Sequence, residues 1–246
     1  MRKVLALATA AVVSAALAAP AAANHSWNGY HWARASNPFT VQSGDNVTSA
    51  WDSYLRQAAG DWSKSTNGNP LRTTVVAGAT TGRKCRATSG RVEVCNAAYG
   101  RNGWLGVASI SISGKHITQA TTKMNDTYYA TGSKYDTPTW RAAVMCQEVG
   151  HAWGLDHQDE SGADFHTCMD YASNPDADNT HPNAHDYEQL AIIYSHLDST
   201  TTIKGLSASP SAKPYKTTRK DGRRSSRITE HFADGSKRIT FIYWAV

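Results

Sequence analysis

The sequence predicts a mixed α+β domain, and three observations support that class. An amphipathic helical pattern spans residues 47–62, four short β-prone runs follow it, and two more helical patterns complete residues 137–197. Strands followed by helices packed on one side are typical of an α+β or mixed α/β domain. The 246 residues, 40% apolar and 18% charged, suit one medium domain with an appendage rather than a disordered or fibrous chain.

The first 23 residues resemble a secretory signal peptide. Arg2 and Lys3 precede an Ala/Val/Leu-rich stretch over residues 4–19, and three alanines end at Ala23 before the polar Asn24. We expect cleavage near Ala23 and export, which lowers the formal charge of the chain from +5 to +3. No later run of about 20 apolar residues occurs, so a multi-span membrane protein is excluded.

The first helix is predicted from its apolar spacing. It begins near Ser43 and stops before the Asn-Gly-Asn-Pro sequence at 67–70. The apolar positions fall at helical intervals and are Val47, Ala50, Trp51, Tyr54, Leu55, Ala58, Ala59 and Trp62.

Short β-prone runs and two more helices follow. The runs cover residues 71–76, 91–95, 104–112 and 116–124 and are separated by Gly and Asn. A second helix is predicted from Thr137, a capping residue followed by Pro138, to about Trp153. A third is indicated by apolar residues from Tyr187 to Leu197 at helical spacing.

The C-terminal tail differs from the rest in charge. Residues 201–246 hold 10 basic and 3 acidic side chains, whereas residues 24–200 hold 13 and 17. We predict a main domain over 24–200, a flexible basic linker over 201–226 and a β-hairpin over 227–246. A two-residue turn at Asp234-Gly235 predicts that Ile228 pairs with Phe241, and we expect this hairpin to dock on a larger partner.

Four cysteines lie in the exported part of the chain. An even count in an oxidising compartment favours two disulfides over free thiols. Three pairings are possible, of which we favour Cys85–Cys95 and Cys146–Cys168. Neither pair has the spacing of a structural zinc finger.

The segment from Gln147 to His157 carries the chemistry. Gln147 and His151 are four residues apart and share one helix face, so both can reach one metal ion. Gly154 allows a sharp exit from the helix, after which His157 can return as a third ligand. Three protein ligands leave an open position for water, and Glu148 is placed to take a proton from that water.

This segment resembles the metzincin zinc-endopeptidase signature H-E-x-x-H-x-x-G-x-x-H. Glu148, His151, Gly154 and His157 match it, and Gln147 stands in place of the first histidine. Neutral amide oxygen is a poorer zinc donor than imidazole, so we expect weaker zinc binding. The resemblance, nearest the matrixin-like group, covers residues 30–197 and implies a twisted, mostly parallel sheet, an active-site helix and a substrate paired with the strand at 116–124.

A second part of the resemblance lies in Cys168-Met169-Asp170-Tyr171, which is similar to the metzincin Met-turn. The resemblance implies that Met169 forms a floor beneath the metal. It also implies that Tyr171 ligates the metal or stabilises the oxyanion, although Tyr171 can equally be a packing residue. The Cys146–Cys168 bridge would join this turn to the helix.

Alternatives remain open at several positions. Gln147 can be an ordinary polar helix residue, in which case His116 or His166 is the replacement donor, and Asp156 is an alternative third ligand. The acidic run at 176–179 lacks the glycine and glutamate of an EF-hand, so a solvated loop is favoured over a calcium site.

The expected function is a secreted, monomeric zinc endopeptidase with one catalytic Zn²⁺ acting on an extended peptide or protein substrate. Two other classes compete with it. One is a pseudo-protease that kept the fold as a binding protein, to which Gln147 points. The other is a polyanion or cell-surface binder that acts through the basic tail, although a soluble tether is the favoured role for that tail.

Overall fold

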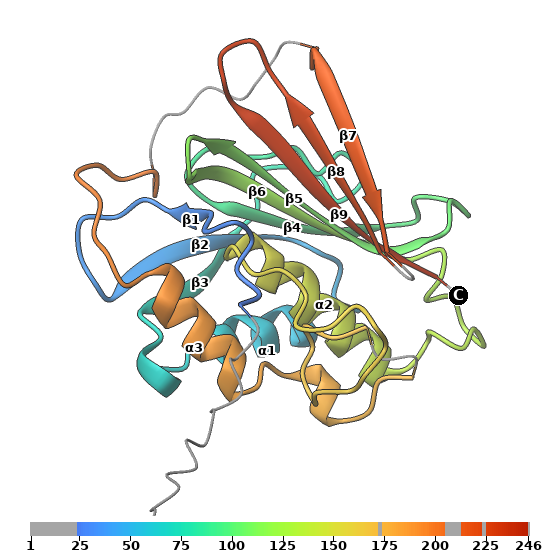
Figure 1. Ribbon diagram of the computed structural model, residues 1–246. Coiled ribbons are helices and arrows are strands. Elements are labelled where there is room, and N and C mark those ends of the chain that lie inside the picture. Colours follow the sequence, from blue (N-terminus) through green and yellow to red (C-terminus); the bar gives the residue numbers. More distant parts are fainter. Residues whose placement is uncertain (1–23, 172–173, 205–212, 223–224, 246) are drawn as a thin grey trace, which may run out of the picture.

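The computed structural model describes residues 24–171, 174–204, 213–222 and 225–245, and shows helices on one side of a large sheet (Figure 1). The sheet has the strand order β3-β2-β4-β6-β5-β9-β8-β7. The short strand β1 pairs with the first residues of β6, before the part of β6 that pairs with β4. The strands are β1 (His31–Trp32), β2 (Phe39–Asn46), β3 (Leu71–Ala77), β4 (Val92–Ala97), β5 (Trp104–Ser113), β6 (His116–Asn125), β7 (Lys216–Asp221), β8 (Ser225–His231) and β9 (Lys237–Trp244). The proposed signal peptide lies outside the described residues.

The sheet is mostly parallel within the main domain, as expected, and antiparallel in its C-terminal part. Pairs among β1, β2, β3, β4 and β6 are parallel, whereas β5 is antiparallel to β6 and to β9, and β7 and β8 extend this antiparallel part. The expectation that the strand at 116–124 offers a free edge is wrong. That strand, β6, pairs with β4 on one side and with β5 on the other, so neither of its edges is free.

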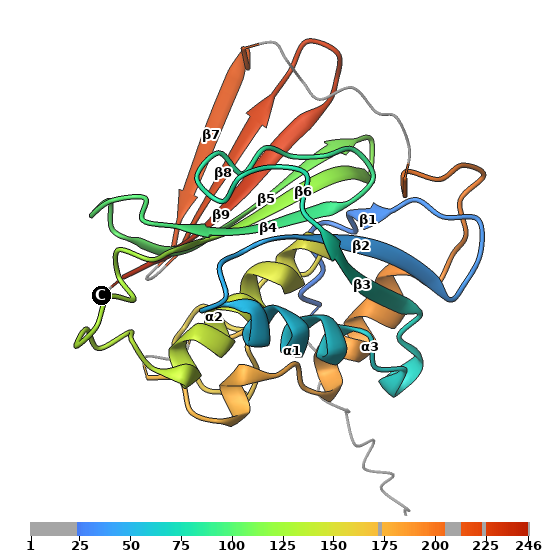
Figure 2. The ribbon, with the colours of Figure 1, turned by 180° about the vertical axis from the view of Figure 1, so that it is seen from behind.

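Three α-helices lie on the same side of the sheet (Figure 2). They are α1 (Asp52–Trp62), α2 (Pro138–Ala152) and α3 (Ala184–Ile193), and the 3₁₀ turns are η1 (Thr66–Gly68) and η2 (Asp178–Thr180). The Thr137 hydroxyl accepts a hydrogen bond from Trp140 N at the start of α2, as expected of a cap. Helix α3 starts earlier than predicted, at an Asn183–Asp186 capping box, and ends before the exposed Leu197.

Two strands of the main domain were not predicted. The alternation of buried Phe39, Val41 and Ser43 in β2 is the signal for one of them, but a helix expected to begin near Ser43 concealed it. Strand β2 pairs in parallel with both β3 and β4, so it forms the centre of the parallel half. The other, β1, is only two residues long, which gives no readable period.

The C-terminal segment is larger than a hairpin. Residues 216–221, expected to be part of the linker, form β7, an exposed strand of Thr and charged residues that pairs with β8. The predicted register is also wrong by one residue, because Ile228 pairs with Thr240 and Arg227 with Phe241. The turn at Gly235 (φ +80°) closes a three-residue loop rather than a two-residue one, which shifts every pair.

The segment docks on the main domain through pairing of β9 with β5, as expected of a marginal hairpin that needs a partner. None of the described helices is long and apolar enough to cross a bilayer.

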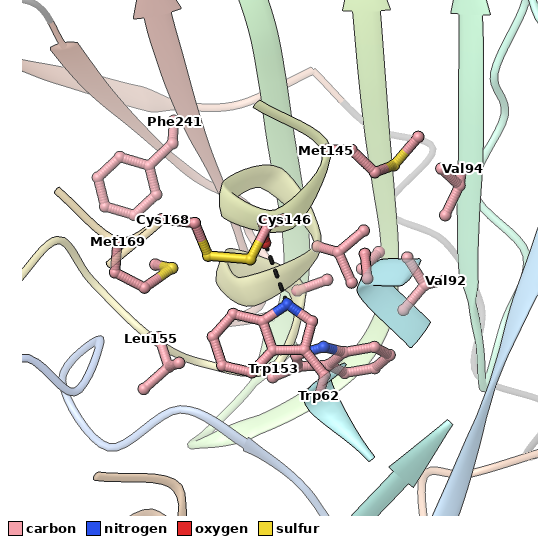
Figure 3. Close-up of a cluster of buried hydrophobic side chains, with 14 of the residues drawn as sticks. Trp62, Val92, Val94, Met145, Cys146, Trp153, Leu155, Cys168, Met169 and Phe241 are labelled. Atoms are coloured by element: carbon pink, nitrogen blue, oxygen red, sulfur yellow. Dashed lines mark hydrogen bonds between the residues drawn. A yellow bond between two sulfur atoms is a disulfide. The ribbon is translucent and has the colours of Figure 1, made fainter. Parts of the chain in front are cut away.

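Both favoured disulfides are present. Cys85–Cys95 joins the loop after β3 to β4, and Cys146–Cys168 joins α2 to the segment before Met169 (Figure 3). The Trp62 indole of α1 donates to the carbonyl of Cys146 at 3.1 Å, so α1 and the disulfide fix α2 from two sides. Two disulfides agree with an oxidising compartment.

Candidate metal centre

Helix α2 carries the first part of the candidate site. Gln147, Glu148 and His151 occupy its last two turns and are 2%, 1% and 0% exposed. Three polar side chains in one buried helix face would destabilise the fold if they had no partners. The positions of those partners therefore decide what this face can do.

The turn after α2 returns the chain to the same face. Gly154 has φ +97°, and a Cβ there would lie 2.1 Å from the carbonyl oxygen of Tyr30. Only glycine combines this backbone conformation with so close an approach. The turn brings His157 back against α2, as predicted.

The three proposed ligand side chains meet. Nε2 of His151 lies 2.9 Å from Nε2 of His157, and the side-chain amide of Gln147 lies 3.0 Å from the same His157 atom. The spacing of four residues along α2 and the turn at Gly154 thus bring together the residues selected from the sequence.

The amide orientation of Gln147 follows from its neighbours. With its nitrogen donating to the carbonyl oxygens of Cys168 and Asp170, at 3.1 and 3.3 Å, its oxygen is the atom that faces His157. The opposite orientation would place the amide oxygen against those two carbonyl oxygens, and neither bond could form. The oxygen is also the only metal-ligating atom of this side chain.

The contacts of Nδ1 in His151 and His157 indicate which atoms face the centre of the cluster. Nδ1 of His151 lies 2.9 Å from the carbonyl oxygen of Leu155, so it carries the proton and leaves Nε2 as an acceptor. Nδ1 of His157 faces carboxylates, at 3.4 Å from Glu160 and 3.7 Å from Asp156. Nε2 of His157 faces two acceptors, the Gln147 amide oxygen and Nε2 of His151, and either a proton on that nitrogen or a bound cation satisfies both.

Burial shifts the charges around this cluster. Desolvation lowers the pKa of His151 well below its ordinary value, and the neighbouring His157 lowers that pKa further. The contact with His157 is the largest cause that lowers the pKa of Glu160, to about 2. His157 therefore contacts a neutral His151 through Nε2 and an ionised Glu160 through Nδ1.

Glu148 is the most isolated of the buried groups. Neither of its carboxyl oxygens has a hydrogen-bond partner among the described residues, and desolvation raises its pKa well above the ordinary value. It lies against β5, where a Cβ on Gly106 would be 2.4 Å from its Oε1. Gly106 thus makes the room that Glu148 occupies, and an unpaired buried carboxyl is a functional-site signal.

Met169 lies where α2 and α1 meet. A Cβ on Gly150 would be 2.5 Å from its sulfur and 2.7 Å from the Trp62 ring, so the sulfur packs closely against α2. The Cys146–Cys168 bridge ends at the adjacent residue (Figure 3). Met169 is fully buried and supports the helix turn that carries the ligands.

Aromatic rings enclose the cluster. Tyr171 is buried with its ring centroid 4.0 Å from that of His157, and burial raises its pKa well above the ordinary value. Phe241 of β9 stacks on His151 at 4.2 Å, and Tyr243 lies 5.0 Å from Tyr171. The sequence reasoning missed Phe241 and Tyr243, although the alternation of β9 was recognised and could have shown that both share one face.

The alternative donors do not lie where the three side chains meet. Asp156 pairs with Arg227 of β8 at 2.9 Å and faces Nδ1 of His157, not the Nε2 that faces Gln147 and His151. Asp156, His157 and Glu160 form a separate group that could hold a metal ion. His116 contacts Asp198, and the exposed His166 lies near Asp164 and Asp178.

The acidic run at 176–179 forms η2, in which carboxylate and amide oxygens bond to nearby backbone N–H groups. Asp164, His166 and Asp176 form an exposed group that could hold a metal ion. Exposed groups of this kind are common without one, so the expectation of a solvated loop rather than a calcium site stays a prediction.

A cavity of about 440 Å³ opens on the sheet face opposite the helices. It contains basic side chains that include Lys84, Arg86, Lys123 and Arg238 and none of the residues of the metal centre. Burial lowers the pKa of Lys123, and the nearby Arg238 lowers it further.

No protein-family model matches the chain, and no curated protein matches it. Among solved structures, that of myroilysin aligns with 70% of this chain and 98% of its own, at 14% sequence identity and a TM-score of 0.39. At that level the similarity does not bear on the function of this protein.

Proposed function

We propose that the protein is a secreted zinc-dependent endopeptidase that cleaves an extended peptide or protein substrate as a monomer. The observation that carries the proposal is the convergence of Gln147, His151 and His157 beside the buried Glu148. The resemblance of residues 147–157 to the metzincin signature supports the reaction class.

The residues fit a zinc ion. Two imidazole nitrogens and an amide oxygen converge, and the adjacent residue of α2, Glu148, has two carboxyl oxygens without a hydrogen-bond partner among the described residues. Two histidines with one oxygen donor are a donor set that zinc accepts, and three protein ligands leave a position open. A zinc ion held there would supply Lewis acidity, which lowers the pKa of a water molecule and polarises a substrate carbonyl.

The chain's own groups would move the protons. Glu148 would accept a proton on a carboxyl oxygen from the attacking water and pass it to the leaving nitrogen as the C–N bond breaks. Gly106 and the surrounding apolar residues exclude other water from Glu148. The hydroxyl of Tyr171 would donate to the developing oxyanion.

One specific observation favours the second candidate, a catalytically inactive binding protein. Phe241 of β9 packs on His151 and His157, two of the three proposed ligands, and Gln147 replaces a strong donor by a weak one. The two candidates differ in turnover, because a pure binder does not need Glu148 as a base.

The test is peptide hydrolysis by the zinc-loaded chain, measured with casein and with quenched fluorescent peptides alongside the bound zinc. We expect Glu148→Gln to abolish cleavage while zinc content and fold persist, and Glu188→Gln, an exposed control on α3, to cleave like the wild type. Stoichiometric zinc with no cleavage by the wild type would favour the inactive binding protein. Equal cleavage by Glu148→Gln would exclude Glu148 as the base.

A further inference from the structure

A second histidine cluster lies apart from the centre described above. His31 of β1, His116 at the start of β6, and His196 and Asp198 after α3 come from three distant parts of the chain. Oδ1 of Asp198 lies 3.1 Å from Nε2 of His116, 3.4 Å from Nε2 of His31 and 3.7 Å from Nε2 of His196. Nε2 of His31 and Nε2 of His196 are 3.1 Å apart.

The donor atoms of this cluster are pre-oriented. Nδ1 of His31 lies 2.8 Å from the carbonyl oxygen of Gly29, so it carries the proton and leaves Nε2 as an acceptor. Oδ2 of Asp198 accepts from Arg34, at 3.0 Å from Nη1 and 3.2 Å from the backbone N–H. These outer contacts leave Nε2 of His31 and Oδ1 of Asp198 facing the same point, as around a bound metal.

The acceptor nitrogen of His31 faces two further groups. Nε2 of His31 lies 3.4 Å from a carboxylate oxygen of Asp198 and 3.1 Å from Nε2 of His196. A divalent cation satisfies all of these acceptors at once.

We propose that His31, His116, His196 and Asp198 form a second, structural site for Zn²⁺. Donors about 2.0–2.1 Å from a tetrahedral zinc lie about 3.4 Å apart, close to the separations measured here. Side chains of His116 and His196 are 36% and 51% exposed, so the ion can enter from solvent. The site would tie the N-terminal strand and the segment after α3 to β6.

The test is the number of zinc ions bound per chain after dialysis, with Co²⁺ absorption as a second readout of tetrahedral geometry. His116→Ala/His196→Ala changes two partly exposed ligands, and His231→Ala on β8 is the matched control. We expect the double variant to bind one equivalent fewer than the wild type and the control to bind the same number. Loss of one zinc equivalent relative to the wild type supports the site whether or not the Gln147 centre binds zinc, because the double variant leaves that centre unchanged.

An unchanged stoichiometry and an unchanged Co²⁺ spectrum in the double variant would overturn the second site. If that variant were poorly folded, the zinc-dependent rise in Tm of the wild type and of His116→Gln would decide. We expect zinc to raise the Tm of His116→Gln less than that of the wild type. An equal rise would also overturn the site.

A separate observation concerns the edge of β5. Strand β9 pairs with β5 along almost its whole length, from Trp104 with Trp244 to Ile112 with Lys237 (Figures 1 and 2). The face of β5 that bears Gly106 contacts Glu148, and Phe241 of β9 lies on that face and stacks on His151. Strand β9 therefore occupies the sheet edge next to the metal centre.

An extended peptide binds a sheet by adding a strand to a free edge. A peptide paired with the edge of β5 would place a carbonyl near His151 and His157. Strand β9 already fills that edge, and the ring of Phe241 lies 4.9 Å from that of His157. Resting on the proposed function, we infer that β7, β8 and β9 form an autoinhibitory segment that must leave β5 before a substrate can bind. Such local opening costs less than global unfolding.

The test locks β9 onto β5 in the full chain. The side-chain oxygens of Ser109 and Thr240 are 2.8 Å apart on the outer face, so Ser109→Cys/Thr240→Cys can form a disulfide away from the metal centre. We expect the locked chain to lose peptide hydrolysis, and each single-cysteine variant to keep it. Hydrolysis by the locked chain at the wild-type rate would overturn the inference.

Native-state hydrogen exchange provides a readout that needs no activity. We expect the β9 amides to exchange through an opening of lower free energy than the β6 amides. Equal protection of β9 and β6 would overturn the inference. If the zinc-loaded wild type does not hydrolyse peptides but β9 opens before β6, the proposed enzyme is contradicted, whereas the displacement of β9 from β5 is supported.

Discussion

The ring of Phe241 lies parallel to the imidazole of His151 within 21°, with 4.2 Å between their centroids. One residue belongs to the last strand of the chain and the other to the helix that carries the candidate ligands. Because of this contact, movement of the C-terminal segment would change access to the candidate metal centre.

Replacing Phe241 should lower the stability of the fold while increasing substrate access to His151. Phe241→Ala removes a buried ring, so we expect the free energy of unfolding to fall by about 3–5 kcal/mol. We also expect kcat/KM for peptide hydrolysis to rise, because the cover over His151 is reduced. Denaturant unfolding and peptide kinetics measure the two effects.

Phe232→Ala is the control for Phe241, since Phe232 is equally buried at the turn of the same segment. It should lower stability without raising kcat/KM. A similar rise in both variants would indicate general loosening rather than an uncovered centre.

Gln147→His should tighten zinc binding. Imidazole is a better zinc ligand than a neutral amide oxygen, and residue 147 already faces His157 at 3.0 Å. Chelator competition measures the affinity, with Gln57→His on α1 as the control. Zinc affinity equal to that of the wild type would argue that residue 147 does not touch the metal.

Gly106→Ala should displace Glu148. The added Cβ would lie 2.4 Å from Oε1 of Glu148, so the carboxyl must move. We expect cleavage to fall at least tenfold, which corresponds to about 1.4 kcal/mol, with zinc content unchanged. Gly60→Ala, where a Cβ meets nothing within 4 Å, should keep full activity and gain slight stability.

The two disulfides should differ in their effect on zinc. Chain entropy predicts a loss of about 3 kcal/mol of stability on removing either one. Cys146→Ala/Cys168→Ala should also weaken zinc binding, because that bridge fixes the helix beside Gln147 to the Met169 segment. Cys85→Ala/Cys95→Ala should leave the zinc affinity unchanged, and thermal unfolding with chelator titration checks both pairs.

Local signals predicted the elements that place the candidate site. The Thr137 cap and Gly154 delimit α2 because they act within a few residues, and the i, i+4 spacing of Gln147 and His151 fixes one helix face. Both disulfides were also favoured correctly.

Long-range relationships were not predictable in this way. The pairing of β9 with β5 depends on residues more than 120 positions apart, and the shift of Ile228 from Phe241 to Thr240 came from a single extra residue in the turn. The cluster of His31, His116 and Asp198 has no spacing signal because its members are joined only by the tertiary fold.

The most direct test of the metal centre is anomalous diffraction at the zinc absorption edge from crystals of the chain grown with Zn²⁺. The proposed function predicts a peak bonded to the Gln147 amide oxygen and to Nε2 of His151 and His157. The absence of a peak there under saturating zinc would contradict it.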